Sequence, residues 1–124
     1  MSTDSLCFIG DAVYSLLVRE MLIARHDGES HSNELHKASV LAVNAAAQAR
    51  AYKIIEPILS DDETAVYKRG RNAHNNHKPR NAQTADYCSA TGLEALFGYL
   101  YLSKNERRIY ELFDKIKSEC LNDI

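Results

Sequence analysis

Two acidic residues lie in segments of the chain that are otherwise apolar. Asp11 follows Gly10 in one segment, and Glu94 follows Leu93 in the other. If both segments are helices, the residues one turn away from either acid include no lysine or arginine. Burying an ionised carboxylate is costly unless a partner compensates the charge. Each acid therefore either meets a tyrosine hydroxyl or a distant arginine in the core, or it serves a chemical purpose.

Two neighbouring carboxylates are suited to binding a hard divalent cation, because the cation relieves their mutual repulsion. Mg²⁺ takes oxygen ligands and usually uses only one or two protein carboxylates, with water and substrate phosphate completing its coordination. A cation bound in this way activates water and stabilises charge on a phosphate. Asp11 and Glu94 are therefore candidate metal-binding residues of a phosphodiester hydrolase, although two acids alone do not decide between this interpretation and that of core residues. The expected cofactor is Mg²⁺, with Mn²⁺ as an alternative.

The segment between residues 64 and 85 is basic and contains no acidic residue. This concentration stands out in a chain whose net charge is -2. Cationic and amide side chains of this kind bind nucleic-acid phosphates. Aromatic residues are not interleaved with them, which disfavours base stacking and favours double-stranded RNA, a ligand recognised mainly by shape, phosphate and 2′-hydroxyl. The alternative is an ordinary solvated loop. The candidate RNA-binding residues are Lys68, Arg69, Arg71, Asn72, Lys78, Arg80 and Asn81.

The spacing of apolar residues predicts the helices that position these side chains. A first helix should run from Leu6 to about Arg25 and, being apolar on nearly all sides, should be central in the fold. A second should be capped by Ser32 or Asn33 and continue, or restart, until Pro57 ends it. The capping box at residues 60–63 predicts a third helix over 61–69.

The second acid lies on a long helix predicted from Thr84, as its cap, to Leu102. Gly92 and Gly98 each cost this helix about 1 kcal/mol relative to alanine, so we expect another backbone to approach closely there or space to be left beside a functional group. A second capping box at 103–106 predicts a last helix to about residue 120. Residues 70–83 should form a loop hinged at Gly70. Together these elements predict one all-α domain.

Composition excludes several classes of protein. With 45% hydrophobic and 26% charged residues, the 124-residue chain is too apolar for a disordered protein. Its longest mostly apolar stretch, residues 12–18, is far too short to span a membrane, and its first residues lack the basic region of a secretory signal. Three widely spaced cysteines predict reduced thiols in a cytoplasmic protein, rather than a disulfide or zinc framework. No membrane partner is expected.

Five motifs, in the same order along the chain, resemble the ribonuclease III family. Residues 8–14, Phe-Ile-Gly-Asp-Ala-Val-Tyr, resemble its signature helix, and residues 90–102 resemble its second acidic helix. The segments 33–38, 68–73 and 78–82 are similar to those of Mini-ribonuclease III, the compact bacterial branch of the family. The resemblance runs from about residue 6 to residue 112, which is nearly the whole chain.

The resemblance implies a homodimeric, all-α endonuclease fold in a single catalytic domain over residues 1–124, without a double-stranded-RNA-binding domain. Each subunit would cut one strand of a duplex and leave 5′-phosphate and 3′-hydroxyl ends. The implied substrate is precursor 23S ribosomal RNA, whose ends this branch matures with the help of a ribosomal protein. Asp11 matches the essential aspartate of the signature, and Glu94 matches the essential metal-binding glutamate. The segments 68–73 and 78–82 match the RNA-contacting loop.

The chain departs from the wider family at two positions. Cys7 stands where the signature has an upstream acid, and Thr91 stands where an aspartate precedes the glutamate by three residues. The family's four acids are thus reduced to two, which leaves open how tightly metal binds and whether a second ion is held. The alternative function is a catalytically inactive RNA-binding or ribosome-associated module. A helical nucleotide pyrophosphatase is disfavoured because no paired acidic ExxE motif is present.

Overall fold

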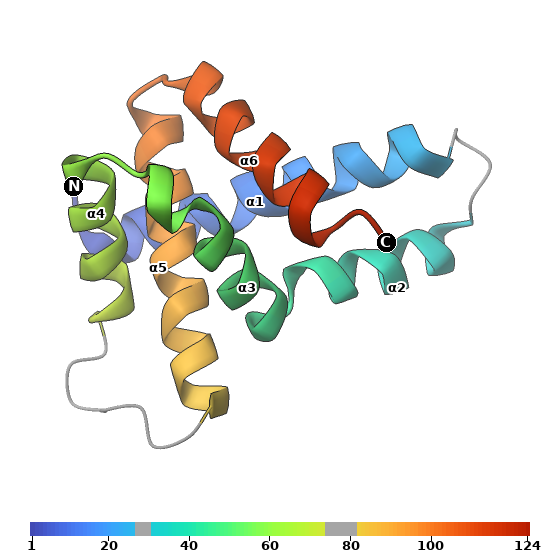
Figure 1. Cartoon of the computed structure of the whole chain (residues 1–124), viewed down its shortest axis with the longest axis horizontal. Helices are drawn as coiled ribbons and strands as arrows, with labels where there is room; N and C mark the ends of the chain where they lie inside the picture. The colour runs from blue at the N-terminus through green and yellow to red at the C-terminus, as the bar shows by residue number, and fades with distance from the viewer. Residues whose placement is uncertain (27–30, 74–81) are drawn as a thin grey trace.

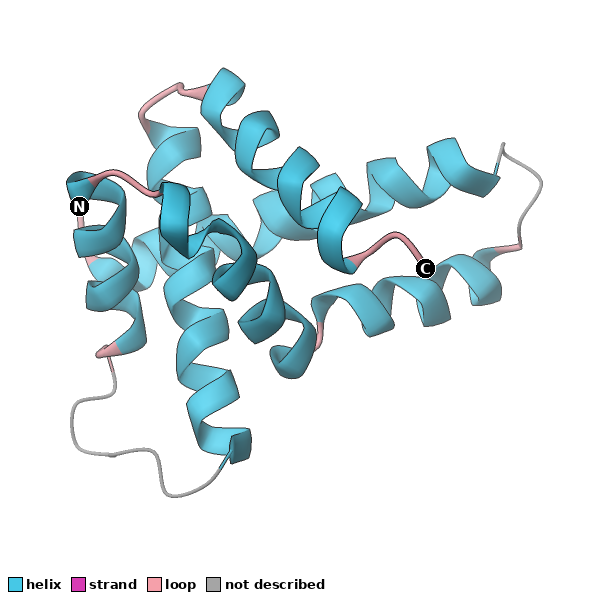
Figure 2. Ribbon diagram, in the orientation of Figure 1, coloured by secondary structure: helices cyan, strands magenta, loops and turns pink. Residues whose placement is uncertain are grey.

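The described part of the protein, in a computed structural model, consists of residues 1–26, 31–73 and 82–124. These residues form helices and connecting loops, with no strand among them (Figure 2). The elements are α1 (Thr3–His26), α2 (Ser32–Val43), α3 (Ala45–Ile55), the 3₁₀ helix η1 (Glu56–Ile58), α4 (Asp61–Arg71), α5 (Ala82–Leu102) and α6 (Glu106–Cys120). The predicted all-α class is confirmed.

Helix α5 is the centre of the fold. It packs against α1, α3, α4 and α6. Figure 1 shows α1 crossing behind α5, while α2 follows the half of α1 that ends at residue 26. The core where α1, α5 and α6 meet is aromatic: the Tyr14 ring stands edge-on to Phe97 and Phe113, with ring centroids 5.3 and 5.7 Å away. The helix that carries Glu94 is therefore held on several sides.

Local hydrogen bonds explain where several helices begin. Asn44 separates α2 from α3, because its backbone is extended and its side chain accepts a hydrogen bond of 2.8 Å from the amide of Ala47. The predicted restart of this helical segment is therefore confirmed. The capping box of α4 is also confirmed: the Ser60 hydroxyl accepts from the Glu63 amide at 3.1 Å, and the Glu63 carboxylate accepts from the Ser60 amide at 2.8 Å.

Glu63 has a second role, because its carboxylate joins the start of α4 to α6. Arg108 of α6 donates to both Glu63 oxygens at 2.8 Å, and it also donates to the carbonyl of Ile58 at 2.7 Å. The hydrogen bonds from Arg108 hold the pKa of the buried Glu63 carboxyl below its usual value. One side chain thus caps α4 and fixes it to the last helix.

Several sequence predictions of helix boundaries are wrong. The N-cap of α2 is His31, without a side-chain hydrogen bond, rather than Ser32 or Asn33. Asn105 caps α6 by accepting a hydrogen bond from the Arg108 amide, whereas Ser103 lies before the turn in which Lys104 takes a φ of 59°. Helix α4 extends to Arg71, and α5 begins at Ala82, so Thr84 lies inside the helix rather than capping it. Asp27 and Gly28, expected to stop the first helix, lie outside the described residues.

Glycines allow the helices to pack with their backbones in contact. A Cβ at Gly98 of α5 would overlap the carbonyl oxygen of Leu6 in α1, and a Cβ at Gly10 would overlap the carbonyl of Glu94. Gly70 of α4 lies against Gly92 of α5, with a Cβ at Gly70 only 2.8 Å from the Gly92 Cα. The predicted close approach at Gly92 and Gly98 is confirmed. The interpretation of Gly70 as a loop hinge is wrong, since it is a buried helix-packing residue.

Helix α1 is buried on one side only, contrary to the sequence prediction. Leu17 and Val18 are in the core, but Phe8, Leu16 and Ile23 are 84%, 63% and 57% exposed. Nothing in the described part of the chain covers this outer face. Despite its length, α1 is not apolar enough to cross a membrane, and the same holds for every other described helix.

The Gly98→Ala variant should be less stable than the wild type. Alanine favours an isolated helix by about 1 kcal/mol, whereas overpacking a tight contact costs about 1–3 kcal/mol or more. The steric effect should dominate because the overlapped atom belongs to the α1 backbone. We expect the free energy of unfolding in urea to fall by about 1 kcal/mol or more. Lys53→Ala, at an exposed position of α3, is the control. Equal or greater stability of Gly98→Ala would contradict this packing.

Candidate active site

A cavity of about 290 Å³ brings the two predicted catalytic acids together. Asp11 reaches it from α1 and Glu94 from α5. Cys7 and Thr91, which replace acids of the wider family, line the same cavity. The remaining lining residues are Asp4, Phe8, Ala73 and Tyr87. Residues far apart in the sequence thus form one site at the place where α1 crosses α5.

Helical periodicity and the glycine contact explain this arrangement. Asp4, Cys7 and Asp11 follow one another at intervals of three and four residues and so share one face of α1. Tyr87, Thr91 and Glu94 share a face of α5 for the same reason. The two faces meet because the backbone at Gly10 lies against the backbone of Glu94.

The two carboxylates differ in their surroundings. Asp11 is exposed, so the expectation that both acids are buried is wrong for this one. Glu94 is partly buried, and burial followed by the negative charge of Asp11 raises the pKa of its carboxyl to about 7. A hydrogen bond shared between the two carboxyl groups adds to the effect, while a bond from Gln48 opposes it.

Neither acid has a cationic partner among the described residues. Every ion pair found there lies elsewhere, on α6 or between α6 and α4. No tyrosine hydroxyl donates to either carboxylate in this part of the structure; Tyr52 and Tyr110 donate to Glu56 and Glu20 instead. The interpretation of the acids as ordinary, satisfied core residues is therefore not supported by the described residues.

Cys7 adds no charge to the site. Burial, followed by the charges of Glu94 and Asp4, raises the pKa of its thiol to about 11. The thiol is accordingly protonated, and it donates a weak hydrogen bond of 3.5 Å to the carbonyl of Thr91. The hydroxyl of Thr91 donates in turn to the carbonyl of Tyr87 at 3.0 Å. All three cysteines of the chain are free thiols, as predicted.

The donor set fits a cation that needs few protein ligands. Within the described residues, no group of three or more histidine, cysteine, aspartate or glutamate side chains is placed to hold a metal. Two carboxylates at one cavity match the one or two that Mg²⁺ commonly takes from a protein. The pKa of Glu94 is raised first by burial and then by the negative charge of Asp11, and a bound cation would relieve the second of these effects. Asp11 and Glu94 are thus the residues able to hold it.

Sequence reasoning missed Gln48, a buried residue of α3. Its amide donates to the carbonyl of Val43 at 2.9 Å and to Glu94 Oε2 at 3.5 Å, while its own carbonyl oxygen has no partner in the described structure. Gln48 therefore fixes Glu94 from the α3 side. The available signal was a glutamine in an alanine-rich segment predicted to be helical. Asp4, at the rim of the cavity, was missed as well, although it lies two turns before Asp11.

The basic residues that the structure describes lie at the end of α4, beside the start of α1. Lys68, Arg69 and Asn72 line an open cavity of about 540 Å³ that shares Asp4 and Ala73 with the cavity of the two acids. Arg69 donates to the Thr3 hydroxyl at 3.3 Å, and the Arg71 guanidinium lies 5.9 Å from the centre of the Tyr67 ring. The predicted RNA-binding residues Lys78, Arg80 and Asn81 lie outside the described residues.

Known proteins share both the sequence pattern and the fold. The Ribonuclease III domain family matches residues 4–105. A protein named Mini-ribonuclease 3 from Brevibacillus brevis is 49% identical over 107 residues, which are 86% of this chain and 78% of that protein. Another of the same name from Streptococcus pneumoniae is 41% identical, over 87% of this chain and 84% of that protein.

A solved structure agrees with these matches. The crystal structure of a protein from Fusobacterium nucleatum superposes with a TM-score of 0.80 at 30% sequence identity, covering 95% of this chain and 93% of that chain. The family match includes both helices that line the site, α1 and α5. The resemblance inferred from five short motifs is therefore confirmed. The chain belongs to the ribonuclease III family, in the branch of the Mini-ribonuclease 3 proteins.

Proposed function

We propose that this chain hydrolyses double-stranded RNA at the cavity between α1 and α5, with Asp11 and Glu94 as its catalytic and metal-binding residues. As a member of the ribonuclease III family it is a double-strand-specific endoribonuclease. The observation that carries the assignment of the site is the meeting of two carboxylates without a cationic partner in the described structure. Mg²⁺ is the proposed cofactor and Mn²⁺ the alternative.

Each residue of the site has a proposed task in this reaction. When bound, the cation would supply Lewis-acid chemistry to water and to the phosphate. Asp11 faces solvent and is accessible to the incoming strand, whereas Glu94 is held in position by Gln48. Water adds to phosphorus and the bond from phosphorus to O3′ breaks, so that the products carry a 5′-phosphate and a 3′-hydroxyl. Lys68, Arg69, Arg71 and Asn72 would bind backbone phosphates beside the cavity.

The proposed natural substrate is precursor 23S ribosomal RNA, whose ends the enzyme would mature with a ribosomal protein as helper. This proposal rests on the likeness to the Mini-ribonuclease III branch. The neutral residues Cys7 and Thr91 limit the site to two acids beyond the rim residue Asp4. Two carboxylates are as many as one Mg²⁺ commonly takes from a protein. We propose that the chain forms a single catalytic domain around this site.

The working unit that we propose is a homodimer, because cutting both strands of a duplex needs two such sites. Support comes from the exposed apolar side of α1 and its neighbours. Leu16, Tyr101, Leu102 and Tyr110 are exposed and line a largely apolar cavity of about 530 Å³. An exposed apolar patch of this kind is typical of an interaction surface. We call these four residues the apolar face.

Loss of either acid should abolish cleavage but leave the fold and RNA binding intact. We expect Asp11→Asn or Glu94→Gln to slow cleavage of a duplex in Mg²⁺ by more than about 100-fold, the scale on which single preorganised electrostatic groups act. Cleavage is followed on a gel, with EDTA as the metal-free control and Asp123→Asn, an exposed acid outside the site, as the matched variant. Wild-type rates in either site variant would remove that residue from the mechanism. A wild-type protein that shifts RNA but never shortens it would establish the inactive binding module.

The pH dependence of stability should report the carboxyl pair. The folded-state pKa of Glu94, about 7, lies above its ordinary value of 4.5, so the folded protein holds this proton more tightly than the unfolded chain. Glu94 therefore stabilises the metal-free fold fully below about pH 4.5, and this contribution is lost as the pH rises through about 7. Glu94→Gln should remove this dependence.

Thermal unfolding in EDTA between pH 5 and 8 tests this prediction. Relative to Glu94→Gln, the wild type should lose stability as the pH rises, and adding Mg²⁺ at pH 8 should stabilise the wild type more than the variant. Identical profiles of the two proteins, with and without Mg²⁺, would contradict the raised pKa and the metal site together.

A charge on the apolar face should separate the dimer. Leu16→Lys places an ammonium group in a surface that the dimer would bury, so we expect the monomer to predominate at concentrations where the wild type is dimeric. Analytical ultracentrifugation measures the mass in solution. Val40→Lys, a comparable substitution at an exposed apolar residue of α2, is the control and should leave the dimer unchanged. A wild type that sediments as a monomer would refute the proposed dimer.

A further inference from the structure

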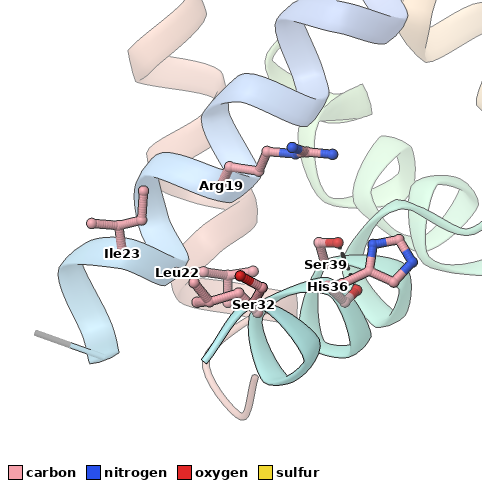
Figure 3. Close-up of a pocket in the computed structure, with 7 residues that line it drawn as sticks. Arg19, Leu22, Ile23, Ser32, His36 and Ser39 are labelled. Carbon is pink, nitrogen blue, oxygen red and sulfur yellow. Dashed lines mark hydrogen bonds between the residues drawn. The ribbon is translucent and has the colours of Figure 1, made fainter. Parts of the chain in front are cut away.

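A further cavity, lined by both polar and apolar residues, lies between α1 and α2, away from the two acids. Its volume is about 250 Å³. Arg19, Leu22 and Ile23 line it from α1, and Ser32, Leu35, His36 and Ser39 line it from α2. Figure 3 shows the Arg19 side chain extending from α1 on the side of the groove where His36 and Ser39 stand on α2. We call this cavity the α1–α2 groove.

The groove has the chemistry of an anion site. None of its lining residues is acidic. Arg19 is exposed and, within the described structure, makes no hydrogen bond or ion pair, so its five N–H donors remain available. An arginine fork matches two oxygens of one phosphate. His36 contributes at least one ring N–H in either tautomer, and the Ser32 hydroxyl is a further donor. Leu22 and Leu35 supply the apolar part of the lining, which suits a sugar beside a phosphate.

On α1, the groove residue Arg19 lies in line with Asp11. Asp11, Ser15 and Arg19 follow one another at intervals of four residues, which places them on neighbouring turns of one helix face. Eight residues of helix correspond to about 12 Å, which is a span of a few nucleotides along a strand. A strand with one phosphate beside Asp11 would therefore have another phosphate within reach of Arg19.

On α2, a second row of residues leads back to the same site. His36, Ser39 and Val43 share a face at intervals of three and four residues. The carbonyl of Val43 accepts the 2.9 Å hydrogen bond from Gln48, whose amide also contacts Glu94. The helix that forms the α2 wall of the groove is therefore linked to Glu94 through Gln48.

One arginine lies on each side of Asp11 along the direction of α1. At one end, Arg69 of α4 contacts Thr3, eight residues before Asp11. Arg19 lies eight residues after Asp11. Cations thus flank the acid at about equal distances along the helix, an arrangement suited to a polyanion that crosses the site and exceeds it on both sides.

We propose that the α1–α2 groove is a phosphate-binding subsite of this enzyme, in which Arg19, with His36 as a second donor, holds a backbone phosphate of the RNA strand a few nucleotides from the one being cleaved. This inference rests on the proposed function. Its ligand chemistry, a phosphate ester, is shared with free nucleotides. Their binding is therefore measured separately.

Cleavage kinetics of the full-length protein test the proposal. Arg19→Ala should raise KM for a duplex by about tenfold with little change in kcat, because the phosphate contact is the same in the ground state and the transition state. The slope of log kcat/KM against log KCl concentration should become shallower by about 1, the value for one lost phosphate contact. Arg19→Lys should recover part of the loss, since a lysine keeps the charge but not the fork.

Arg107→Ala is the matched control, because Arg107 is an arginine of α6 that is 92% exposed and does not line the groove. Its KM and salt slope should equal those of the wild type. Equal losses in Arg107→Ala and Arg19→Ala would show a general effect of net charge and overturn the subsite. Thermal unfolding of each variant shows whether Arg19→Ala is folded; if it is not, Arg19→Lys and His36→Asn provide the same comparison.

The remaining outcomes distinguish the two levels of the proposal. A wild type that does not cleave duplex RNA would refute the proposed function and the subsite with it. A wild type that cleaves, together with an Arg19→Ala variant of unchanged KM and salt slope, would overturn only the subsite. Adenosine monophosphate is titrated over the same concentrations at which duplex RNA saturates the protein. Its binding to the wild type and to Arg19→Ala should be equal. A difference there, without an effect on the duplex, would assign the groove to a free nucleotide and overturn the RNA proposal.

Discussion

The contact between the backbones of α1 and α5 is the constraint on which the site depends. Gly10 and Gly98 have no side chains to separate the two helices, so each lies against a carbonyl of the other helix. Both acids belong to the first of these contacts, because Asp11 directly follows Gly10 and Glu94 contributes the carbonyl against which Gly10 lies. The same contact that packs the core therefore determines how close the two carboxylates are. Packing of the two helices establishes this proximity against their electrostatic repulsion. The pKa of Glu94 is raised first by burial and second by the negative charge of Asp11.

The two acids of the site have different surroundings. Glu94 is shielded by α5 and α3 and is fixed by the Gln48 amide, whereas Asp11 lies on the open side of α1. One partly buried, hydrogen-bonded acid beside one that is open to solvent suits the proposed binding of both a cation and a bulky polymer. Because the Cys7 thiol between Asp4 and Asp11 is neutral, an approaching phosphate meets less negative charge than it would if residue 7 were an acid.

Much of this arrangement could be predicted from sequence, because the signals were local. The capping box at Ser60 and the apolar periodicity of α1 depend on residues within one or two turns, and both indicated the correct helices. The tight approach at Gly92 and Gly98 could be inferred because a glycine in a helix needs a packing reason. The pairing of Asp11 with Glu94 came from chemistry and from the likeness to a known family.

The errors arose where distant contacts decide the structure. The residues around Gly70 are typical of a loop, yet its contact with Gly92 keeps Gly70 helical and buried. The exposure of Asp11 and Phe8 depends on which side of α1 the other helices leave uncovered, and periodicity alone does not identify that side. Gln48 acquires its role only when α3 packs against α5. In each case the deciding partner is more than twenty residues away in the sequence.

Glu63 attaches α4 to the rest of the fold through a single side chain. The same carboxylate caps the helix and accepts hydrogen bonds from Arg108, so a substitution of Glu63 would remove both interactions. Because α4 is one continuous helix, a change in the position of its first turn also moves the basic residues of its last turn. The orientation of the basic residues in the last turn of α4 therefore depends in part on an ion pair at the first turn of the helix.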